Sequence, residues 1–470
     1  MSGNGHHDTN ATHFTPATRY PAVSVGNGKA EAEARRKAFP YRFPRDPRPF
    51  GGKFTVKENG RRLMRYFYFE RRLSHAIGAW TLAIPEFEVK LECGRHIFYH
   101  MDAARALRER LTEQEQSVTI VDGFKDADID RFFDEMLSAA DAPELLVGLH
   151  QVAGRALDTA YRHHIDLTCQ VADAPTIRAF KRILVDYDPM LQWANAAIAA
   201  YVEGGIDEAR LNAWRWHLQQ LLDSIGGVAG DGQRGNSPAN LRSATTPFER
   251  GTVPMRDSRF VTFKNTGDYD VADGTPRYPK DSYENLRLRF IRTQRDEVDA
   301  IEAFGTFLHD IRMMDFQAEY DLARVTWDEA RHTEIGYRSM QVSGYDPYEL
   351  ANRLTGSTCR GPMEPAFAMA EINLFGEVGV LKTINQLVDK ARDENDTLLA
   401  HISDFIRSDE RTHVKKGQHI LRVMTDLKMQ DLEERTRELF TECMVSLGIV
   451  NKDMDLFTVS REDIEQLIGE

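Results

Sequence analysis

Two short strings in the second half of the chain carry the residues best suited to chemistry. Each reads Asp-Glu-x-x-His, and they occupy residues 328–332 and 409–413. Three residues along an α-helix turn the chain by about 300°, so the Glu and the His of each string lie one turn apart on the same side. One such pair is common on a solvated helix face. Two copies, each on the second helix of a helical hairpin, predict carboxylates and imidazoles that converge on metal ions.

The first helix of each hairpin must then supply one more carboxylate at a matching depth. Glu302 lies 27 residues before Glu329, and Glu377 lies 33 residues before Glu410. Glu302 and Glu377 both have apolar sequence neighbours, and burying a carboxylate without a counter-charge or a metal is costly. The rival ligands on these two helices, which depth disfavours, are Glu297 and Glu371.

The predicted site therefore combines four carboxylates with two imidazoles. Its metal ligands are Glu302, Glu329, His332, Glu377, Glu410 and His413, and the four glutamates are also the predicted catalytic residues. Two divalent metals balance the charge of four glutamates. Hard oxygen donors with one nitrogen per metal favour two iron ions, with an iron–manganese pair or manganese as alternatives. Asp328 and Asp409 are predicted to accept hydrogen bonds from the free N–H groups of the ligating histidines.

These residues resemble the ferritin-like di-iron carboxylate superfamily. The closest likeness is to a poorly characterised ferritin-like domain family that carries Ala-Ile-Glu, Asp-Glu-x-Arg-His, a mid-helix Glu and Asp-Glu-x-x-His. The matching positions are Ala300–Glu302, Asp328–His332, Glu377 and Asp409–His413, and the resemblance covers about residues 290–425. It implies a ferritin-like four-helix bundle with two iron ions, and an O2-dependent oxidoreductase of the monooxygenase type.

The expected function is the activation of O2 to oxidise a small organic substrate, by hydroxylation or N-oxygenation. Gly376 and Gly379 flank Glu377 and would leave space beside the metals, although close helix packing explains them equally well. Because no Gly-rich phosphate loop stands between a strand and a helix, we expect electrons from a separate reductase or ferredoxin. The open alternatives are a ferroxidase or iron-handling protein, a redox or radical partner subunit, and a transfer-RNA hydroxylase.

The N-terminal half could hold a degenerate second bundle without metal. His150 could mark a former ligand helix, and Val185–Pro189 lies where a further Asp-Glu-x-x-His is expected but has no His. A stripe at four-residue steps could bind a metal, although an ordinary polar face or a contact surface is the simpler interpretation. Its residues are Glu88, Glu92, His96 and His100.

Helical periodicity dominates the chain, so the predicted fold class is all-α. The main helices are predicted near 62–82, 84–111, 142–170, 174–203, 286–312, 314–342, 362–393, 396–425 and 429–446. The predicted regions are an irregular arm (1–55), a helical domain (56–223), a long loop or linker (224–282), the dimetal bundle (283–427) and a helical tail (428–470).

Composition limits the partners. A net charge of −13 argues against a general nucleic-acid or anionic-membrane binder. No apolar run approaches the roughly 20 residues that span a bilayer. The four cysteines lie far apart and suit a reducing cytoplasm. We therefore expect a cytoplasmic protein that meets O2, a small substrate and an electron donor. The oligomeric state stays open, with a homodimer as one option because helical proteins of this type often dimerise.

Overall fold

The computed structural model describes residues 28–38, 46–264 and 277–450. The chain divides into two units, Met1–Pro49 and Phe50–Glu470. The first unit contains α1 (Lys29–Ala38). The prediction of an irregular arm over 1–55 was therefore wrong for this stretch, which consists only of the strong helix formers Ala, Lys, Glu and Arg.

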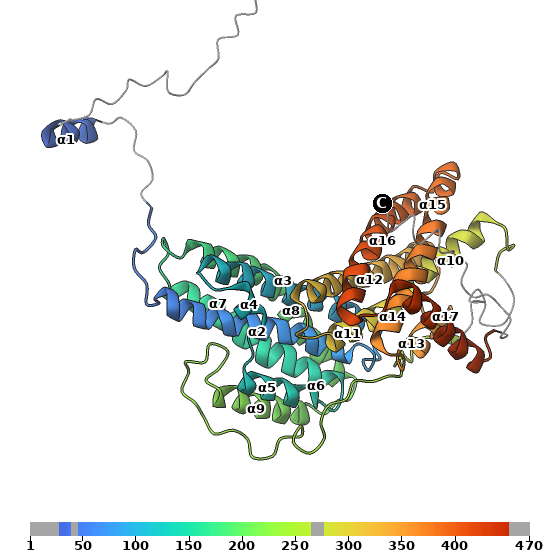
Figure 1. Cartoon of the computed structure of the whole chain (residues 1–470), viewed down its shortest axis with the longest axis horizontal. Helices are drawn as coiled ribbons and strands as arrows, with labels where there is room; N and C mark the ends of the chain where they lie inside the picture. The colour runs from blue at the N-terminus through green and yellow to red at the C-terminus, as the bar shows by residue number, and fades with distance from the viewer. Residues whose placement is uncertain (1–27, 39–45, 265–276, 451–470) are drawn as a thin grey trace, which may run out of the picture. The chain divides into compact units, whose positions relative to one another are not determined.

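The second unit is all-α, which confirms the predicted fold class (Figure 1). Among its described residues the only strands are β1 (Phe263–Lys264) and β2 (Asn352–Arg353), which pair in parallel over two residues. The helices follow from the 3.6-residue spacing of apolar side chains, which gives each helix a face to bury.

An N-terminal group of helices begins with a capping box, in which the side chains of Thr55 and Glu58 each bond the other's backbone N–H. Its third long helix is interrupted by a π-helical segment, η2. The elements of this group are α2 (Val56–Trp80), α3 (Phe87–Glu113), α4 (Val118–Asp122), α5 (Ala127–Leu137), α6 (Ala142–Leu146), η2 (Val147–Gly154), α7 (Arg155–Leu167), α8 (Ala174–Glu203) and α9 (Glu208–Ser224).

A C-terminal group of helices contains both Asp-Glu-x-x-His motifs. The helix predicted near 286–312 is present in two pieces, and the helix predicted near 362–393 contains a second π-helical segment, η3. The elements are α10 (Tyr283–Arg295), α11 (Val298–Asp310), α12 (Phe316–Val342), α13 (Thr355–Arg360), α14 (Pro365–Ala370), η3 (Glu371–Gly376), α15 (Glu377–Asp393), α16 (Thr397–Met424) and α17 (Met429–Ser446).

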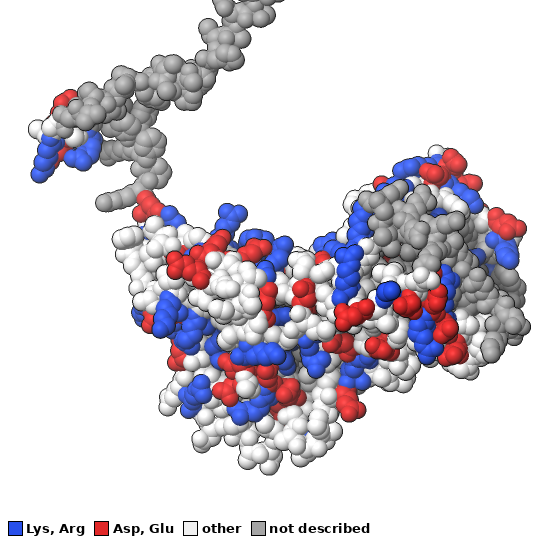
Figure 2. Space-filling model, viewed as in Figure 1, with Lys and Arg blue, Asp and Glu red and all other residues white. Residues whose placement is uncertain are grey.

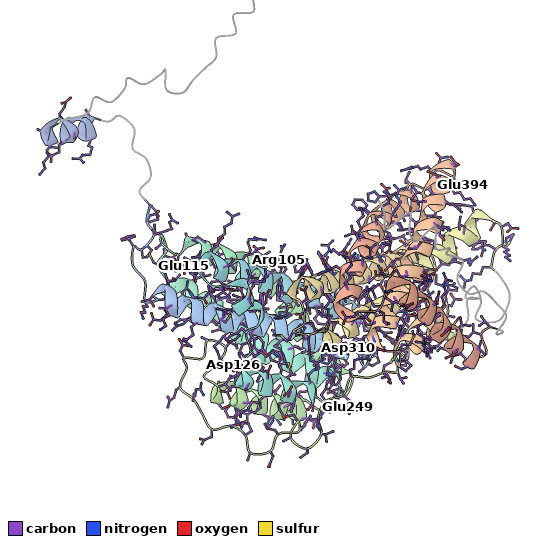
Figure 3. The ribbon with its side chains drawn as sticks, viewed as in Figure 1. Arg105, Glu115, Asp126, Glu249, Asp310 and Glu394 are labelled. Atoms are coloured by element: carbon purple, nitrogen blue, oxygen red, sulfur yellow. The ribbon has the colours of Figure 1, made fainter. Side chains whose placement is uncertain are left out.

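The two groups pack against each other through α2 and α3 on one side and α11 and α12 on the other (Figure 1). A buried ion pair links them, since Arg71 Nε of α2 lies 2.7 Å from a Glu319 oxygen of α12. A second contact involves Arg105 of α3, which is labelled in Figure 3. Its guanidinium carbon lies 4.7 Å from the centroid of the Tyr320 ring of α12.

The long segment between the groups crosses the surface of both. The backbone N–H of Met255 donates to Leu82 in the N-terminal group at 2.8 Å. Arg250 pairs with Asp310 at 2.9 Å, at the end of α11 (Figure 3). The described part of this segment, which was predicted as a long loop or linker over 224–282, thus contacts both helical groups, and these lie in one compact unit.

Acidic and basic side chains are interspersed over the face that Figure 2 shows, without one dominant patch of either sign. A search of the described helices finds none with the length and hydropathy that a bilayer-spanning segment needs. The expected absence of nucleic-acid and membrane partners stays a prediction.

Candidate metal centre

Buried carboxylates and imidazoles converge inside the C-terminal group. Two sets of side chains each present ligand atoms within 4.8 Å of one another, and every member is buried. Each set could hold a metal ion. The first set is Glu329, Glu377, Glu410 and His413, and the second is Glu297, His332 and Glu410.

Glu329 and Glu410 each face both histidines. One oxygen of Glu329 lies 3.1 Å from Nδ1 of His413, and the other lies 3.7 Å from Nδ1 of His332. The corresponding distances for Glu410 are 3.0 Å and 3.5 Å. The two carboxylates therefore stand between the imidazoles, each with one oxygen toward each ring.

Glu297 and Glu377 complete the arrangement at its two ends. Glu297 Oε2 lies 3.2 Å from His332 Nδ1, and Glu377 Oε1 lies 3.7 Å from His413 Nδ1. Each imidazole thus has one carboxylate of its own besides the two that it shares. The cluster, which we call the carboxylate–histidine cluster, is nearly two-fold symmetric.

The outer nitrogens of the imidazoles face aspartates from the opposite motif. His332 Nε2 lies 3.2 Å from Asp409, and His413 Nε2 lies 3.4 Å from Asp328. Arg331 donates to Asp409 at 2.7 Å and also contacts Asp328. These contacts fix the ring orientations and tie α12 to α16, because each aspartate serves the histidine of the other helix.

Burial and mutual contacts set the ionisation of the cluster. Burial opposes charge on Glu329, but the imidazoles of His332 and His413 outweigh it and lower the Glu329 pKa to about 2. Burial raises the pKa of Glu297 to about 7, and burial beside a second carboxylate raises that of Glu410 well above its usual range. Despite burial, the surrounding carboxylates raise the pKa of both imidazoles.

Several atoms that face the interior of the cluster make no hydrogen bond to any described residue. Glu297 Oε2 and His332 Nδ1 lie close together without hydrogen-bond alignment, and Glu329 Oε1 also lacks a donor. Buried polar atoms are nearly always paired, so a cluster of exceptions calls for an explanation. Oxygen and nitrogen atoms directed at shared space are what metal coordination requires, so these residues fit a metal ion.

The structure places Glu302, one of the six predicted ligands, outside both sets. Its buried carboxylate contacts Lys90 of α3, Arg256 of the surface segment and Ser357 of α13. Five residues separate Glu302 from Glu297, which corresponds to about 140° around a helix, so the two side chains face different ways. The buried carboxylate that we attributed to a metal is compensated by cations that are distant in the sequence.

Glu297, the rival on the same helix, occupies the place expected of Glu302. A signal for this choice was present in the sequence. Glu297 lies 32 residues before Glu329, close to the 33 residues that separate Glu377 from Glu410. Two equivalent hairpins should have nearly equal spans, and a span of 27 residues does not meet that condition.

A break between α10 and α11 positions Glu297. Gln294 donates to Glu297 Oε1 at 2.7 Å, and buried Arg295 donates to the carbonyls of Leu350 and Ala351 at 3.1 and 2.7 Å. Gly336 lets α12 approach this break closely, because a Cβ at this position would lie 2.1 Å from the backbone nitrogen of Arg295. The break is therefore anchored from both sides.

On the second hairpin, the π-helical segment η3 ends one residue before Glu377. Such segments add a residue to a helical turn and are frequent at functional sites. Asn373 in η3 donates to the carbonyls of His413 and Val414 at 3.2 and 3.3 Å. The Asn373 amide therefore holds η3 against α16.

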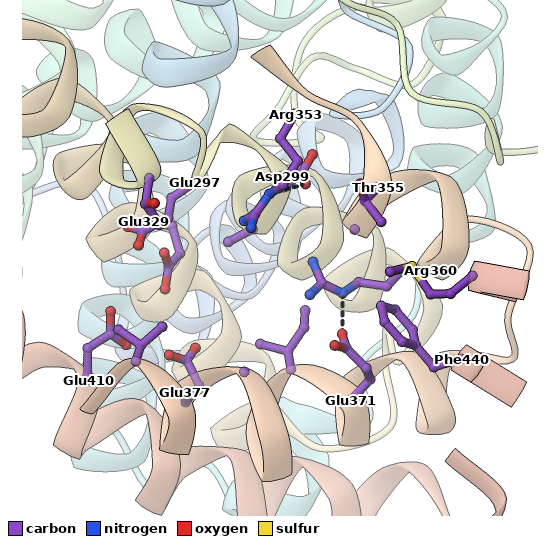
Figure 4. Close-up of a pocket in the computed structure, with 17 residues that line it drawn as sticks. Glu297, Asp299, Glu329, Arg353, Thr355, Arg360, Glu371, Glu377, Glu410 and Phe440 are labelled. Atoms are coloured by element: carbon purple, nitrogen blue, oxygen red, sulfur yellow. Dashed lines mark hydrogen bonds and ion pairs between the residues drawn. The ribbon is translucent and has the colours of Figure 1, made fainter. Parts of the chain in front are cut away.

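A cavity of about 350 Å³ opens beside the cluster (Figure 4). Glu297, Glu329, Glu377 and Glu410 line its inner end. Gly376 also lines it, and a Cβ there would meet only the Glu371 carbonyl oxygen at 3.8 Å, so space does lie beside this residue. Glu371, the second rival ligand, instead pairs with Arg360 at 2.6 Å, the dashed contact in Figure 4.

Three aromatic residues of α12, the helix that carries Glu329, make packing contacts with α3. Trp327 stacks on Phe98 with ring centroids 4.9 Å apart. The Tyr320 hydroxyl donates to Asp102 at 3.2 Å, and Tyr337 packs on Phe87. These contacts are all with α3, so they belong to the junction of the two helical groups.

The N-terminal group contains a different buried polar cluster around Glu70 of α2. One Glu70 oxygen accepts hydrogen bonds from the hydroxyls of Tyr161 and Tyr187, the latter at 2.6 Å. The other oxygen lies 2.7 Å from Nδ1 of His100. Tyr187 stands within Val185–Pro189, where a further motif was expected, and α8 continues through the proline without a break.

The predicted stripe on α3 is divided among different surroundings. Glu88 pairs with Arg259 on the surface, whereas the buried ring of His96 lies 5.0 Å from that of His150. Both sets of candidate metal ligands found among the described residues lie in the C-terminal group.

Comparisons with protein-family models, with curated proteins and with solved structures find no match for this chain. The chain is thus an all-helical protein whose buried glutamates and histidines could hold metal, and no family is assigned to it.

Proposed function

We propose that the chain is a non-haem di-iron oxidase or oxygenase that uses O2 to oxidise a small organic substrate. The observation that carries the proposal is the position of Glu329 and Glu410, each with one oxygen toward each of two imidazoles. A ferritin-like bundle that holds two metals needs this combination of shared and separate carboxylates.

The ligands divide into two half-sites. His332 and Glu297 would hold one metal, and His413 and Glu377 would hold the other. Glu329 and Glu410, which face both imidazoles, would serve both. Four carboxylates balance two divalent cations, and hard oxygen donors with one nitrogen per metal favour iron or manganese. This set keeps five of the six ligands predicted from the sequence and replaces Glu302 with Glu297.

The chain's own contribution is to position the ligands and to shape the space beside them. Asp328, Asp409 and Arg331 hold the two imidazoles in fixed orientations. Metal binding would displace the protons that the raised pKa values of Glu297 and Glu410 retain. When bound, the iron pair supplies the chemistry of O2 activation, and a separate reductase or ferredoxin supplies electrons.

The cavity favours an organic substrate over iron storage. Its volume of about 350 Å³ falls within the range of small-molecule sites, and it reaches four of the cluster's carboxylates. Apolar side chains line much of the cavity, among them Ile372, Val380 and Phe440. A path for iron alone would not need such a lining.

The first test is metal content per chain, measured by mass spectrometry on untagged protein. We expect about two iron ions per chain, or iron with manganese. The Glu329→Ala/His413→Ala double variant should lose them. Glu394→Ala/His401→Ala changes the same residue types at exposed positions on the second hairpin and should retain them. Metal retained by the first variant, or no stoichiometric metal in the parent protein, would refute the site.

The second test separates oxidation of a substrate from iron handling. Reduced protein is mixed with O2, and O2 uptake is followed with and without added ferrous iron. Consumption that stops after one turnover of the bound metals supports an enzyme that awaits its substrate. Continued uptake with ferrous iron, and retention of many irons per chain, would favour a ferroxidase instead.

A further inference from the structure

The outer end of the cavity carries hydrogen-bond donors that the metal cluster does not use. Arg360 of α13 donates through Nε to Glu371 at 2.6 Å. Its two terminal amino groups have no hydrogen-bond partner among the described residues, and the side chain is only 13% exposed. The hydroxyl of Thr355, which is 8% exposed, is likewise buried without a described partner.

Figure 4 shows the Arg360 guanidinium facing the space near Asp299 and Thr355, across the cavity from Glu410 and Glu329. Gly356 keeps this space open, because a Cβ there would lie 2.7 Å from Nη1 of Arg360. The ion pair with Glu371 holds the plane of the guanidinium while leaving its two amino groups directed elsewhere.

The wall between the two ends is largely apolar. Ala300, Ile372 and Val380 line it from the helices of the cluster, and Phe440 and Met444 of α17 close it from the outside. A molecule in this cavity would therefore meet the cluster's carboxylates or metals at one end and apolar surface along its body. At the other end it would meet the donors of Arg360 and Thr355 beside the carboxylates of Asp299 and Glu371.

We propose that Arg360 and Thr355 bind the carboxylate of the substrate, so that the substrate is a small organic acid with its apolar body directed toward the cluster. The inference rests on the proposed function for the role of the inner end. A planar guanidinium pairs with a carboxylate through two parallel hydrogen bonds, and a hydroxyl adds a third donor. An uncharged carbonyl would accept from one of these donors but bring no charge to pair with the guanidinium, and a cationic head group would be repelled by it.

The test compares acids with their uncharged counterparts. Decanoate and 4-phenylbutyrate, each beside its primary amide, are titrated into the full-length, metal-loaded protein by calorimetry. The acids should bind at least about tenfold more tightly than the amides, as expected for hydrogen bonds to a charged group. Equal binding of acid and amide, or no binding of either acid at millimolar concentration, overturns the proposal.

Two variants assign the preference to Arg360. Glu371→Gln keeps the guanidinium and removes the carboxylate that competes for it, so the preference for acids should persist or grow. Arg360→Gln/Glu371→Gln removes the guanidinium and does not leave the Glu371 carboxylate unpaired. In this variant the ratio of the acid's affinity to the amide's affinity should fall to about one. Arg338→Gln, at an exposed arginine of α12, is the matched control and should keep the ratio.

An unchanged acid preference in Arg360→Gln/Glu371→Gln would mean that the acids bind the metals, and it overturns the proposal. Titrating chelator-treated protein separates the two proposals. Acid binding that depends on Arg360 but not on metal supports this inference even if the di-iron function fails. If the protein binds two irons but its preference for acids does not depend on Arg360, the di-iron site is supported and the acid-binding subsite is refuted.

Discussion

The N-terminal and C-terminal helical groups share one order of elements. Each begins with two long helical stretches, followed by shorter elements. A short helix with proline in its first turn then continues through a π-helical segment into a longer helix, and two more helices complete the group. In the first group the interrupted helix is α6–η2–α7, and in the second it is α14–η3–α15. The same frame therefore surrounds two different buried polar clusters.

The clusters differ in how their carboxylates are satisfied. Glu70 receives two tyrosine hydroxyls on one oxygen and contacts His100 with the other, so a single carboxylate has three partners. The carboxylate–histidine cluster places four carboxylates around two imidazoles and leaves interior atoms without donors. A buried carboxylate alone is thus weak evidence for metal. An excess of acceptors over donors at one point is strong evidence.

Removing a carboxylate that both ligand sets share should have the largest effect on metal binding. Glu410 belongs to both ligand sets, so Glu410→Ala should abolish binding of both metals, from about two per chain to near zero. Metal content by mass spectrometry is the measurement. Glu371→Ala, at a carboxylate paired with Arg360 in the same cavity, serves as control and should retain the metals. Retention of one metal in Glu410→Ala would mean that the glutamate serves only one half-site.

Glu297 and Glu302 give the sharpest test of the ligand set. Glu297→Gln should lower the metal content, because the amide is a poor ligand and His332 loses its separate carboxylate. Glu302→Gln should keep the metals but lower the unfolding temperature, because it leaves Lys90 and Arg256 without their shared partner. The reverse outcome would restore Glu302 as the ligand.

Local spacing was sufficient to predict much of this arrangement. Helices were predicted at 174–203 and 429–446, which are the bounds of α8 and α17. The two Asp-Glu-x-x-His motifs located the clustered histidines, because residues three apart share a helix face. Neither motif depends on contacts distant in the sequence, so both could be found without a structure.

Contacts between distant residues could not be predicted. Nothing in the sequence near Glu302 indicates Lys90 or Arg256, which reach it from another helix and from an irregular segment. The break before Glu297 also lacks a proline or glycine as a signal, since it depends on Arg295 binding carbonyls of residues 350 and 351. The sequence therefore identified most of the clustered carboxylates and both histidines, but it assigned one candidate ligand, Glu302, from its apolar sequence neighbours.

The junction between the groups should make stability depend on pH. Burial opposes charge on Glu319, but Arg71 and His75 outweigh it and lower its pKa to about 2. A folded-state pKa below the unfolded value near 4.5 means that the stabilisation is complete above about pH 5 and is lost as the pH falls toward 2. Glu319→Gln should cost about 3–5 kcal/mol at pH 7, the range for breaking a buried pair.

Urea unfolding of wild type and Glu319→Gln, at several pH values between 7 and 3, measures this dependence. The difference in the free energy of unfolding should narrow as the pH falls from 5 to 3, because Glu319 takes up a proton in the unfolded chain near pH 4.5 while the folded ion pair excludes it. Glu334→Gln, which changes a partly exposed side chain on the same helix, is the control. A difference that stays constant with pH would contradict the role of Glu319.

The N-terminal cluster should behave as a purely structural one. Tyr187→Phe removes one hydroxyl from Glu70 and should lower the free energy of unfolding by about 1–3 kcal/mol, the cost of leaving a buried group unsatisfied. Metal content should not change. Tyr99→Phe, at a partly exposed hydroxyl on α3, is the control for loss of a tyrosine hydroxyl. Loss of iron in Tyr187→Phe would mean that the two clusters depend on each other.

The smallest expected effect compares the glycines that end the two π-helical segments, Gly376 of η3 and Gly154 of η2. Both have helical backbone angles, so alanine fits the backbone at either position. A Cβ at Gly376 would meet only a carbonyl oxygen at 3.8 Å, whereas at Gly154 it would lie 3.3 Å from Leu191 and 3.0 Å from a carbonyl oxygen. Gly376→Ala should therefore raise the free energy of unfolding by about 0.5–1 kcal/mol, through the lower entropy of the unfolded chain. Gly154→Ala should not raise the free energy of unfolding measured with urea, because the close contacts of the added methyl group offset the entropy gain. Equal increases in the free energy of unfolding at both positions would mean that the space beside Gly376 is not specific to the C-terminal group.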